Sequence, residues 1–164
     1  MPAPINIRLA TPDDWSAIWP LFAAVIAGGD TYMLAPETPE ADARAYWMAA
    51  DCRTYIAHIG AEVVGTYALR TNFRGLGAHV ANAGYMVRPG LFGRSIGTTL
   101  CAHSLTEALR LGYTAMQFNA VVSTNSRAVA LWQRMGFNIV GTVPGAFNHR
   151  TLGLVDIYVM HRLL

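Results

Sequence analysis

Short stretches of alternating or mainly apolar residues are spread along the chain, and they predict the strands of a sheet. The first is Ile5–Leu9 (INIRL). Two more, Arg53–Ile59 and Glu62–Arg70, flank Gly60-Ala61 and predict a β-hairpin. Four later segments complete the predicted sheet: 79–87, 113–122, 138–142 and 155–162.

Four helices are predicted between these strands from residues that begin and end helices. The first begins after residues 11–14 (TPDD), which combine a cap, a first-turn proline and acidic side chains, and it stops at Gly28-Gly29. The second is expected over about 38–50. The third runs from about 93 to 111, and the fourth from the STNS segment at 123 to 135.

The resulting element order is β-α-α-β-β-β-α-β-α-β-β, which excludes an all-helical or all-strand fold. It predicts an α/β (α+β) fold with a mixed, mostly antiparallel central sheet of about six to seven strands, flanked by about four helices. No repeat or low-complexity tract divides the chain, so one domain over residues 1–164 is expected.

Composition and charge narrow the class of protein. The 12 basic residues are all arginines scattered along the chain, and the net charge is +2, so no nucleic-acid partner is expected. Apolar residues make up 53% of the chain and charged residues only 13%. This balance favours a protein that buries part of its surface in a homodimer.

The sequence predicts no membrane segment, secretion signal or metal site. The most apolar early run, WSAIWPLFAAVIAGG, is too short to span a membrane. The N-terminus lacks the apolar core of a secretion signal. Cys52 and Cys101 match no metal or disulfide spacing, which is typical of reduced thiols in a cytoplasmic protein. His103 and Glu107, one helical turn apart, are expected to be solvated.

The segment 87–100 (VRPGLFGRSIGTTL) passes from a strand through a glycine-rich turn into a helix. The unpaired N–H groups and positive dipole end of a helix start can hold a phosphate without a cationic side chain. Arg88 and Arg94 are candidates to add charge-assisted contacts. By itself, however, the segment also fits a plain strand-to-helix turn.

A second motif lies downstream, in MQFNAVVSTNSRAVALWQRMGFNIVGTVPGAF, where Asn125, Ala128, Leu131, Gly136 and Phe137 follow the pattern Asn-x-x-Ala-x-x-Leu-x-x-x-x-Gly-Phe. Together with the glycine-rich turn, this half of the chain resembles the GNAT superfamily of acyl-CoA-dependent N-acyltransferases. The element order is similar over residues 5–162, and the motifs over 82–147. The resemblance implies an acetyl-CoA-dependent N-acetyltransferase whose sheet is splayed between the strands 79–87 and 113–122.

The resemblance also implies positions for the coenzyme. The turn and helix start would wrap its pyrophosphate, through Phe92, Gly93, Arg94, Ser95, Ile96, Gly97 and Thr98. Asn125, Ala128 and Trp132 would contact the coenzyme further along. A backbone N–H at Met86 or Val87 would polarise the thioester carbonyl.

A narrower resemblance lies in four segments: DTYMLAPETPE, HVANAGYMV, MQFNAVVSTN and GTVPGAFNHRTLGLVDIYVM. They are similar to GNAT enzymes that acetylate small amino acids and analogues, namely the phosphinothricin-type and azetidine-carboxylate (proline analogue) enzymes. This narrower resemblance implies a small amine as the acceptor. Tyr32, Asn82 and Asn119 are the candidate acceptor contacts. Asn119 is also assigned to catalysis, with Tyr85 as the first candidate for the base and His79, His149 and Asp30 as alternatives.

Three residues depart from the superfamily pattern. Phe92 stands where Arg or Gln is usual, and Ser95 stands where Gly is usual. Trp132 replaces a tyrosine that often protonates the leaving thiolate. Ser95 is expected to adopt helical geometry, and Arg88 or Arg94 to supply charge. Two alternatives therefore accompany the small-amino-acid hypothesis: acetylation of another amine (a polyamine, an antibiotic or a peptide N-terminus), and a non-catalytic acyl-CoA-binding sensor.

Overall fold

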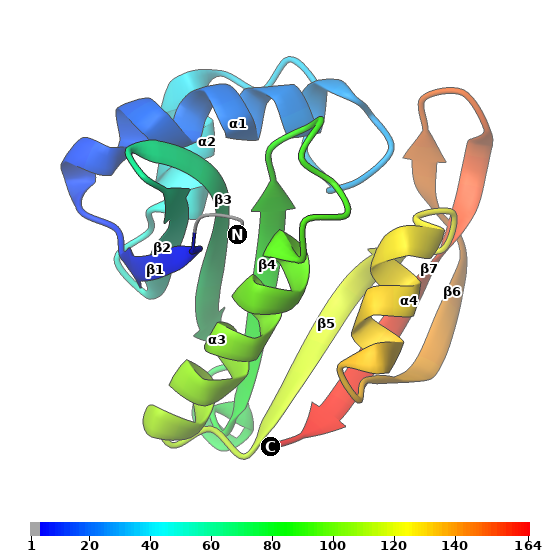
Figure 1. The fold of residues 1–164 in the computed structure, drawn as a ribbon. Coiled ribbons are helices and arrows are strands. Elements are labelled where there is room, and N and C mark those ends of the chain that lie inside the picture. The colour runs from blue at the N-terminus through cyan, green and yellow to red at the C-terminus, as the bar shows by residue number, and fades with distance from the viewer. Residues whose placement is uncertain (1–3) are drawn as a thin grey trace.

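One seven-stranded sheet, in the order β1-β2-β3-β4-β5-β7-β6, runs through the molecule (Figure 1). The computed structural model describes residues 4–164, and residues 1–3 of the predicted domain lie outside this range. The strands are β1 (Asn6–Leu9), β2 (Cys52–Ile59), β3 (Glu62–Thr71), β4 (Val80–Val87), β5 (Ala115–Val122), β6 (Asn138–His149) and β7 (Gly153–Leu163).

The sheet is antiparallel except between β4 and β5, which run parallel. These two strands pair at only two positions, Val80 with Ala115 and Ala81 with Met116, and they then diverge. The predicted splay between them is confirmed. Because the strands separate in mid-sheet, both leave backbone groups without a strand partner along the inner edges of the split.

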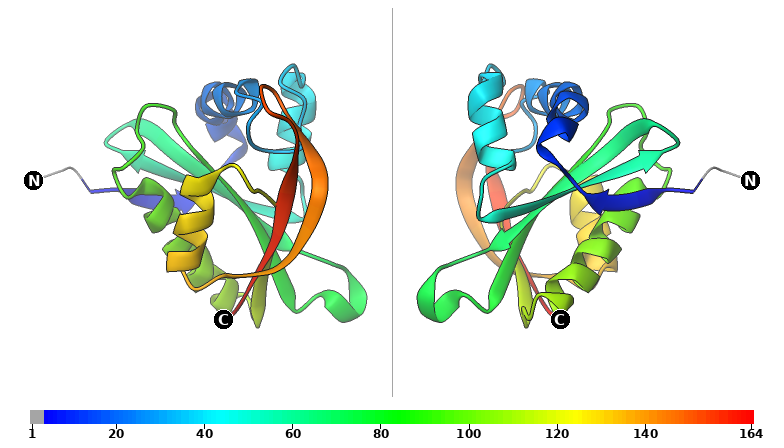
Figure 2. Two further views of the ribbon diagram at one scale, coloured as in Figure 1. Left: turned by 90° about the vertical axis from the view of Figure 1, so that its right-hand side faces the viewer. Right: turned by 90° about the vertical axis from the view of Figure 1, so that its left-hand side faces the viewer.

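Two pairs of helices cover the two faces of the sheet (Figure 2). α1 (Trp15–Ala27) and α2 (Glu40–Trp47) pack on one face, and α3 (Ile96–Arg110) and α4 (Ser126–Arg134) on the other. Successive residues of a strand point to opposite faces, so Tyr67 joins the α3 core and Ala68 the α1 core. The predicted mixed fold is confirmed. Within residues 4–164, no helix combines the length and apolarity that crossing a membrane requires.

Several element boundaries differ by two or more residues from the sequence prediction. α2 ends at Trp47 instead of near Ala50, and α3 begins at Ile96 instead of near Gly93. β6 continues to His149 instead of ending at Thr142. Gly141, Pro144 and Gly145 in this segment resemble a turn, but register shifts at 139–141 and 143–147 absorb them. A proline is tolerated there because β6 is an edge strand.

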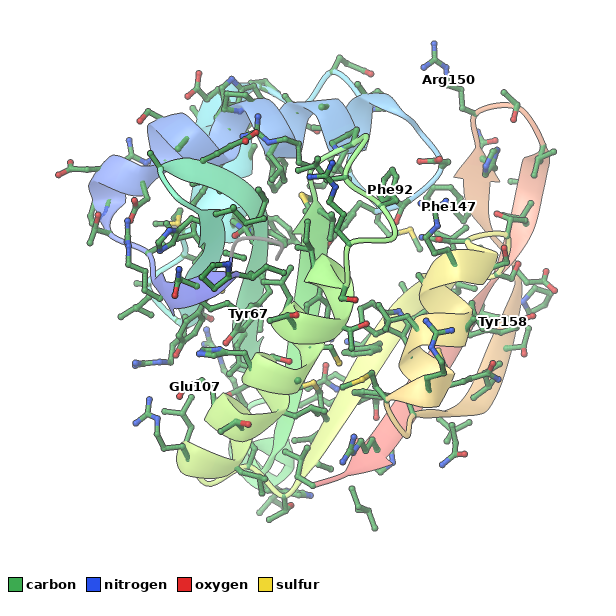
Figure 3. All side chains as sticks on the ribbon, viewed as in Figure 1. Tyr67, Phe92, Glu107, Phe147, Arg150 and Tyr158 are labelled. Carbon is green, nitrogen blue, oxygen red and sulfur yellow. The ribbon has the colours of Figure 1, made fainter. Side chains whose placement is uncertain are left out.

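The expectation that His103 and Glu107 are merely solvated is wrong. The Tyr67 hydroxyl lies 2.7 Å from Nδ1 of His103, and the Tyr55 hydroxyl donates to Oε2 of Glu107 at 2.6 Å. Arg110 donates twice to the same carboxylate. These contacts fasten the outer side of α3 to β2 and β3, on the left of Figure 3. The Arg110 guanidinium is the main reason that the pKa of Glu107 falls to about 2.

Glu107→Gln should lower the free energy of unfolding by about 1 kcal/mol at pH 7, after allowance for solvent screening. The folded-state pKa lies below the ordinary value of 4.5. The carboxylate therefore stabilises the fold fully above about pH 4.5, and this contribution is lost as the pH falls towards 2. Urea unfolding at pH 7 and at pH 3 would measure the difference, which should shrink at the lower pH. An equal difference at both pH values would contradict this account.

Candidate active site

The edge of β4 that faces β5 presents unpaired backbone groups. At the two ends of β4, Asn72 N donates to Val80 O at 2.8 Å and Arg88 N donates to Val64 O at 2.9 Å. The even-numbered residues therefore bond to β3, and the odd-numbered ones direct their N–H and C=O groups towards β5. Since β5 pairs no further than Ala81, the N–H of Val87 points into the split. Of the two predicted oxyanion donors, Val87 has this orientation and Met86 faces β3.

The opposite edge of the split carries a β-bulge. Phe118 is opposite Met160 and Val121 is opposite Tyr158, so the segment 119–120 contains one residue more than β7 provides. Bulges redirect side chains and are frequent near active sites. Here the bulge coincides with the point at which Asn119 becomes exposed, in an otherwise largely buried strand.

A cluster of side-chain amides spans the floor of the split. Asn72 Oδ1 accepts from Nδ2 of Asn119 at 2.7 Å and from Nδ2 of Asn82 at 3.2 Å. Gln117 Nε2 donates to Asn119 Oδ1 at 3.0 Å. We call Asn72, Asn82, Gln117 and Asn119 the amide cluster. Asn72 Nδ2 is the one buried side-chain nitrogen or oxygen within residues 4–164 that has no hydrogen-bond partner.

The amide cluster lies on the face of the sheet covered by α1 and α2. Met86 packs in that core, and Asn82 shares its face because the two residues are an even number apart. Sequence reasoning selected Asn82 and Asn119 as polar residues on apolar strands. It missed Asn72, which follows β3 in a segment that resembles an ordinary loop, and Gln117.

Tyr32 reaches β4 from the loop between α1 and α2. Its hydroxyl donates to the carbonyl oxygen of Tyr85 at 2.8 Å, on the edge of β4 that faces the split. Gly84 allows this approach, because a Cβ there would lie 3.0 Å from the Tyr32 hydroxyl. The backbone of Tyr32 has φ of 62°, a left-handed conformation that a tyrosine seldom adopts and that is common at functional sites. Tyr32, a predicted acceptor contact, thus meets the edge of β4 two residues from Val87. It lies on the α1–α2 side of the sheet, as the amide cluster does.

The side chain of Tyr85 lies on the other face, towards α3. Its hydroxyl lies 2.6 Å from Ser104 Oγ, and burial raises its pKa well above the ordinary tyrosine value. A phenol that holds its proton this strongly is a poor general base. Trp132 packs against the Tyr85 ring at 4.8 Å and against Phe118 at 5.0 Å, and so belongs to the core below the split.

His149, an alternative base, lies at the tip of the β6–β7 hairpin. Its Nδ1 accepts from the backbone N–H groups of Thr151 and Leu152 at 3.2 and 3.3 Å. These bonds indicate a turn-forming role. The neighbouring Arg150, labelled in Figure 3, donates to Ala27 O at 3.0 Å and so holds the hairpin tip against the end of α1.

The glycine-rich turn has the open geometry that a phosphate site requires. Gly93 has φ of 84° and a Cβ there would meet no atom within 4 Å. Ser95 precedes α3 with φ of 60°, so the expectation that it adopts helical geometry is wrong. The left-handed backbone explains why glycine is usual at this position in the family that the sequence resembles. Gly97 has a different role, because a Cβ there would lie 3.1 Å from Leu131 on α4.

Ser95→Gly should raise the free energy of unfolding by about 1 kcal/mol, because it removes the cost of a left-handed serine. Thermal and urea unfolding of the free protein would measure the gain. Ser126→Gly, placed in the first turn of α4, is a suitable control, since it lies within a helix and should destabilise the protein. No gain for Ser95→Gly would show that the serine makes compensating contacts.

The arginines near the turn differ from those that the sequence predicts to supply its positive charge. Arg88 Nε and Nη2 donate to Val63 O at 3.0 and 2.6 Å, and Nη1 lies 3.4 Å from Glu62. Arg88 therefore serves the start of β3 and is not available to the turn. Arg94 is exposed. Sequence reasoning missed Arg127 on α4, whose guanidinium lies over the Phe92 ring at 4.4 Å.

Asn125 has a structural role that the sequence also encodes. It is the N-cap of α4, and its Oδ1 accepts from the N–H of Ala128 at 3.2 Å. Its predicted contact with the coenzyme, like that of Ala128, remains a prediction.

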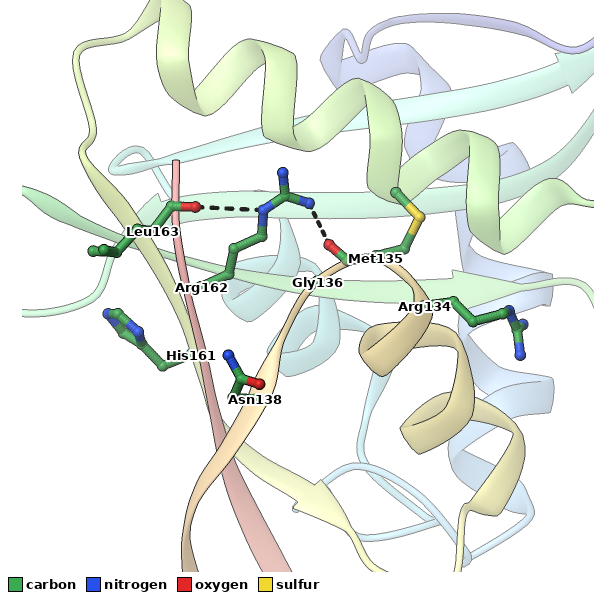
Figure 4. A pocket seen from close by; sticks show the side chains of 7 residues that line it. All are labelled: Arg134, Met135, Gly136, Asn138, His161, Arg162 and Leu163. Atoms are coloured by element: carbon green, nitrogen blue, oxygen red, sulfur yellow. Dashed lines mark hydrogen bonds between the residues drawn. The ribbon is translucent and has the colours of Figure 1, made fainter.

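A separate pocket lies where α4 ends and β6 begins (Figure 4). Arg162 donates there to the carbonyl oxygens of Met135 and Leu163. The pocket contains none of the predicted site residues, which gather instead around the split. Within residues 4–164, no three His, Cys, Asp or Glu side chains are grouped as a metal site requires.

The split between β4 and β5, the start of α3 and the amide cluster together indicate which kind of ligand the site suits. Unpaired β4 edge groups suit an extended amide-containing arm, and the open turn at the start of α3 suits a pyrophosphate. The residues therefore fit a coenzyme A thioester, and the fold and site are those of an acyl-CoA-dependent transferase. A model of the acetyltransferase (GNAT) family matches residues 20–137, and the chain belongs to this family. It is an N-acetyltransferase by family, with acetyl-CoA as its co-substrate.

Known relatives agree with this assignment. A GCN5-related N-acetyltransferase from Kribbella flavida is 43% identical, with 98% of each chain covered and a TM-score of 0.92. The N-acetyltransferase aca1 of Schizosaccharomyces pombe is 31% identical over 98 residues, which is 59% of this chain and 47% of that protein. The chain thus matches about half the length of this relative. A phosphinothricin acetyltransferase (Pat) from Sinorhizobium meliloti, in complex with AcCoA, shares the fold at 19% identity and a TM-score of 0.83, covering 98% of this chain and 88% of that one.

Proposed function

We propose that the protein transfers an acetyl group from acetyl-CoA to the amino group of a small amino acid or a similar compound. The amide cluster carries this proposal. It supplies N–H and C=O groups at the split, on the face that α1 and α2 cover, and it includes a buried donor without a partner. Amide N–H groups suit a carboxylate, and free amide oxygens suit an ammonium group.

The proposed chemistry is direct transfer within one complex. The acceptor nitrogen attacks the thioester carbonyl carbon, so a C–N bond forms and the C–S bond breaks. The N–H of Val87 stabilises the oxyanion that develops. The proton of the amine passes to water, because Tyr85 is held by Ser104 on the opposite face. The leaving thiolate needs no strong acid, since its ordinary pKa is about 8.5.

Tyr32 contributes to this site by holding the α1–α2 loop against β4. Its hydroxyl is already used by the Tyr85 carbonyl, so its ring is the part that would line the acceptor site. The phosphinothricin acetyltransferase from Sinorhizobium meliloti supports an amino-acid-like acceptor by analogy of fold.

Thiol release from acetyl-CoA over a panel of amines would test the proposal. The panel pairs each small amino acid with its amide, which keeps the amine and lacks the carboxylate. Turnover with amino acids and little with their amides is expected. Turnover mainly with polyamines, antibiotics or peptide N-termini would favour the wider acceptor class. Strong binding of acetyl-CoA with no turnover on any amine would favour the non-catalytic sensor. The packing of Trp132 in the core, where it offers no acid to the thiolate, is also compatible with a sensor.

We further propose that the protein is a cytoplasmic homodimer of one domain. Two observations support this: Cys52 and Cys101 are free thiols, and β6 is a largely exposed edge strand with apolar side chains, including Val140 and Val143. Such an edge is a natural place for a second copy to pair. Light scattering of the purified protein would give its mass in solution, and a monomeric mass would overturn the dimer.

A further inference from the structure

Phe92 and Arg127 join the two sides of the split at the end where the glycine-rich turn lies. Phe92 is in the turn between β4 and α3, and Arg127 is in the first turn of α4. The guanidinium carbon lies 4.4 Å from the centre of the Phe92 ring. Figure 3 places Phe92 on the turn, facing the start of α4. The contact therefore spans from one helix start to the other.

The position of Arg127 is not explained by the stability of α4. A helix N-terminus carries partial positive charge, so a cation in the first turn is unfavourable. None of the four ion pairs within residues 4–164 includes Arg127. Its described partner is an aromatic ring that is itself 51% exposed. A cation placed against the helix dipole, with no carboxylate beside it, suits a site that receives an anion.

The contact with the Phe92 ring leaves the N–H groups of Arg127 available to bind that anion. A guanidinium held over an aromatic ring is attracted by its charge, and its N–H groups can still donate to an anion. Those N–H groups match phosphate oxygens. The turn itself has Phe92 where related sequences have Arg or Gln, and Arg88 is bound to Val63 and Glu62. A second cation, in addition to the exposed Arg94 of the turn, is thus present on α4, next to the position that Phe92 occupies.

We propose that Arg127 contacts a phosphate group of the coenzyme and that Phe92 positions it to do so. This inference goes beyond the proposed function, because it concerns the coenzyme and holds for any acceptor. Phe92 is a positioning residue that acts through Arg127. The two residues together take the place of an arginine at position 92.

Titration calorimetry with CoA would test the proposal without any acceptor. Arg127→Ala should raise the Kd for CoA about tenfold or more, the effect of losing a charge-assisted hydrogen bond. The salt dependence of the Kd should also become weaker. Arg134→Ala removes the same charge from the last turn of the same helix and should leave the Kd unchanged. The melting temperature of free Arg127→Ala should not fall.

Repeating the titrations with 3′-dephospho-CoA would identify the phosphate. If the pyrophosphate is the partner, the effect of Arg127→Ala persists; if the ribose 3′-phosphate is the partner, the effect disappears. Phe92→Leu keeps an apolar side chain without an aromatic face and should raise the Kd about two- to fivefold. In the double variant Phe92→Arg/Arg127→Ala, the cation returns to the turn, and the Kd should recover to within about threefold of the original value.

An unchanged Kd in Arg127→Ala would overturn the proposal, and so would an equal loss in Arg134→Ala. A lower melting temperature with unchanged CoA binding would show that the Phe92–Arg127 pair only fastens the turn to α4. Each of these results differs from a failure of the acceptor proposal, which would leave CoA binding intact and abolish turnover on amino acids.

Discussion

Val87→Pro should lower kcat about 100-fold to 1,000-fold, the cost of removing one oxyanion donor. Proline has no backbone N–H, and the N–H of Val87 faces the split instead of β3, so the substitution removes no bond of the β3–β4 ladder. The preceding residue, Met86, lies in a strand, which is the conformation that proline favours in its neighbour. The fold should therefore tolerate the change. Initial rates of thiol release at saturating substrates would give kcat.

Val87→Ala is the matched control, because it shortens the side chain and keeps the N–H. It should retain most of kcat, with a moderate loss of stability. The melting temperature and the Kd for CoA of both variants would show whether the fold and the coenzyme site persist. If Val87→Pro stays folded, binds CoA and keeps full kcat, another group must stabilise the oxyanion.

Asn72→Asp should lower kcat/KM for an amino-acid acceptor about 100-fold. The new carboxylate keeps an oxygen that can accept from Asn82 and Asn119, and it replaces the one buried amide nitrogen that has no partner. The amide cluster can therefore persist, but it becomes negatively charged. Repulsion between two carboxylates about 6 Å apart costs about 3 kcal/mol at an effective dielectric constant of about 20.

The matched substrate for this variant is the amide of the same amino acid. Its amine is retained and its charge is absent, so kcat/KM for the amide should be nearly unchanged by Asn72→Asp. The Kd for acetyl-CoA should also be unchanged. An equal loss with both substrates would mean that Asn72 supports the fold of the site and that the acceptor's carboxylate lies elsewhere.

The fold was predictable because its signals are local and repeated. Glycines and prolines mark the ends of helices, and strands such as β3 combine the apolar residues that a doubly covered sheet requires. The errors arose where tertiary structure overrides these signals. β6 continues past Gly141 and Pro144 because its partner β7 pairs around two register shifts. Ser95 lies outside α3 because the turn needs a left-handed residue there.

The sequence located part of the candidate site but not the contacts between its residues. Motif spacing selected the turn, and polarity on apolar strands selected Asn82 and Asn119, which the fold brings together at the split. No sequence pattern shows that Asn72 joins them, since this contact depends on how the end of β3 lies beside the bulge of β5. In the same way, only the folded chain shows that Arg88 turns towards Val63 and that Arg127 meets Phe92.

The sheet separates the predicted acceptor contacts from the residues that are proposed to contact or position the coenzyme phosphates. The amide cluster and Tyr32 are grouped with the α1–α2 face, whereas Phe92 and Arg127 belong to the turn and helix on the α3–α4 side. Substitutions on one side are not in contact with those on the other, and their energetic effects should add. Acceptor preference can therefore diverge among relatives, or be altered in a combinatorial library, while coenzyme affinity is inherited unchanged.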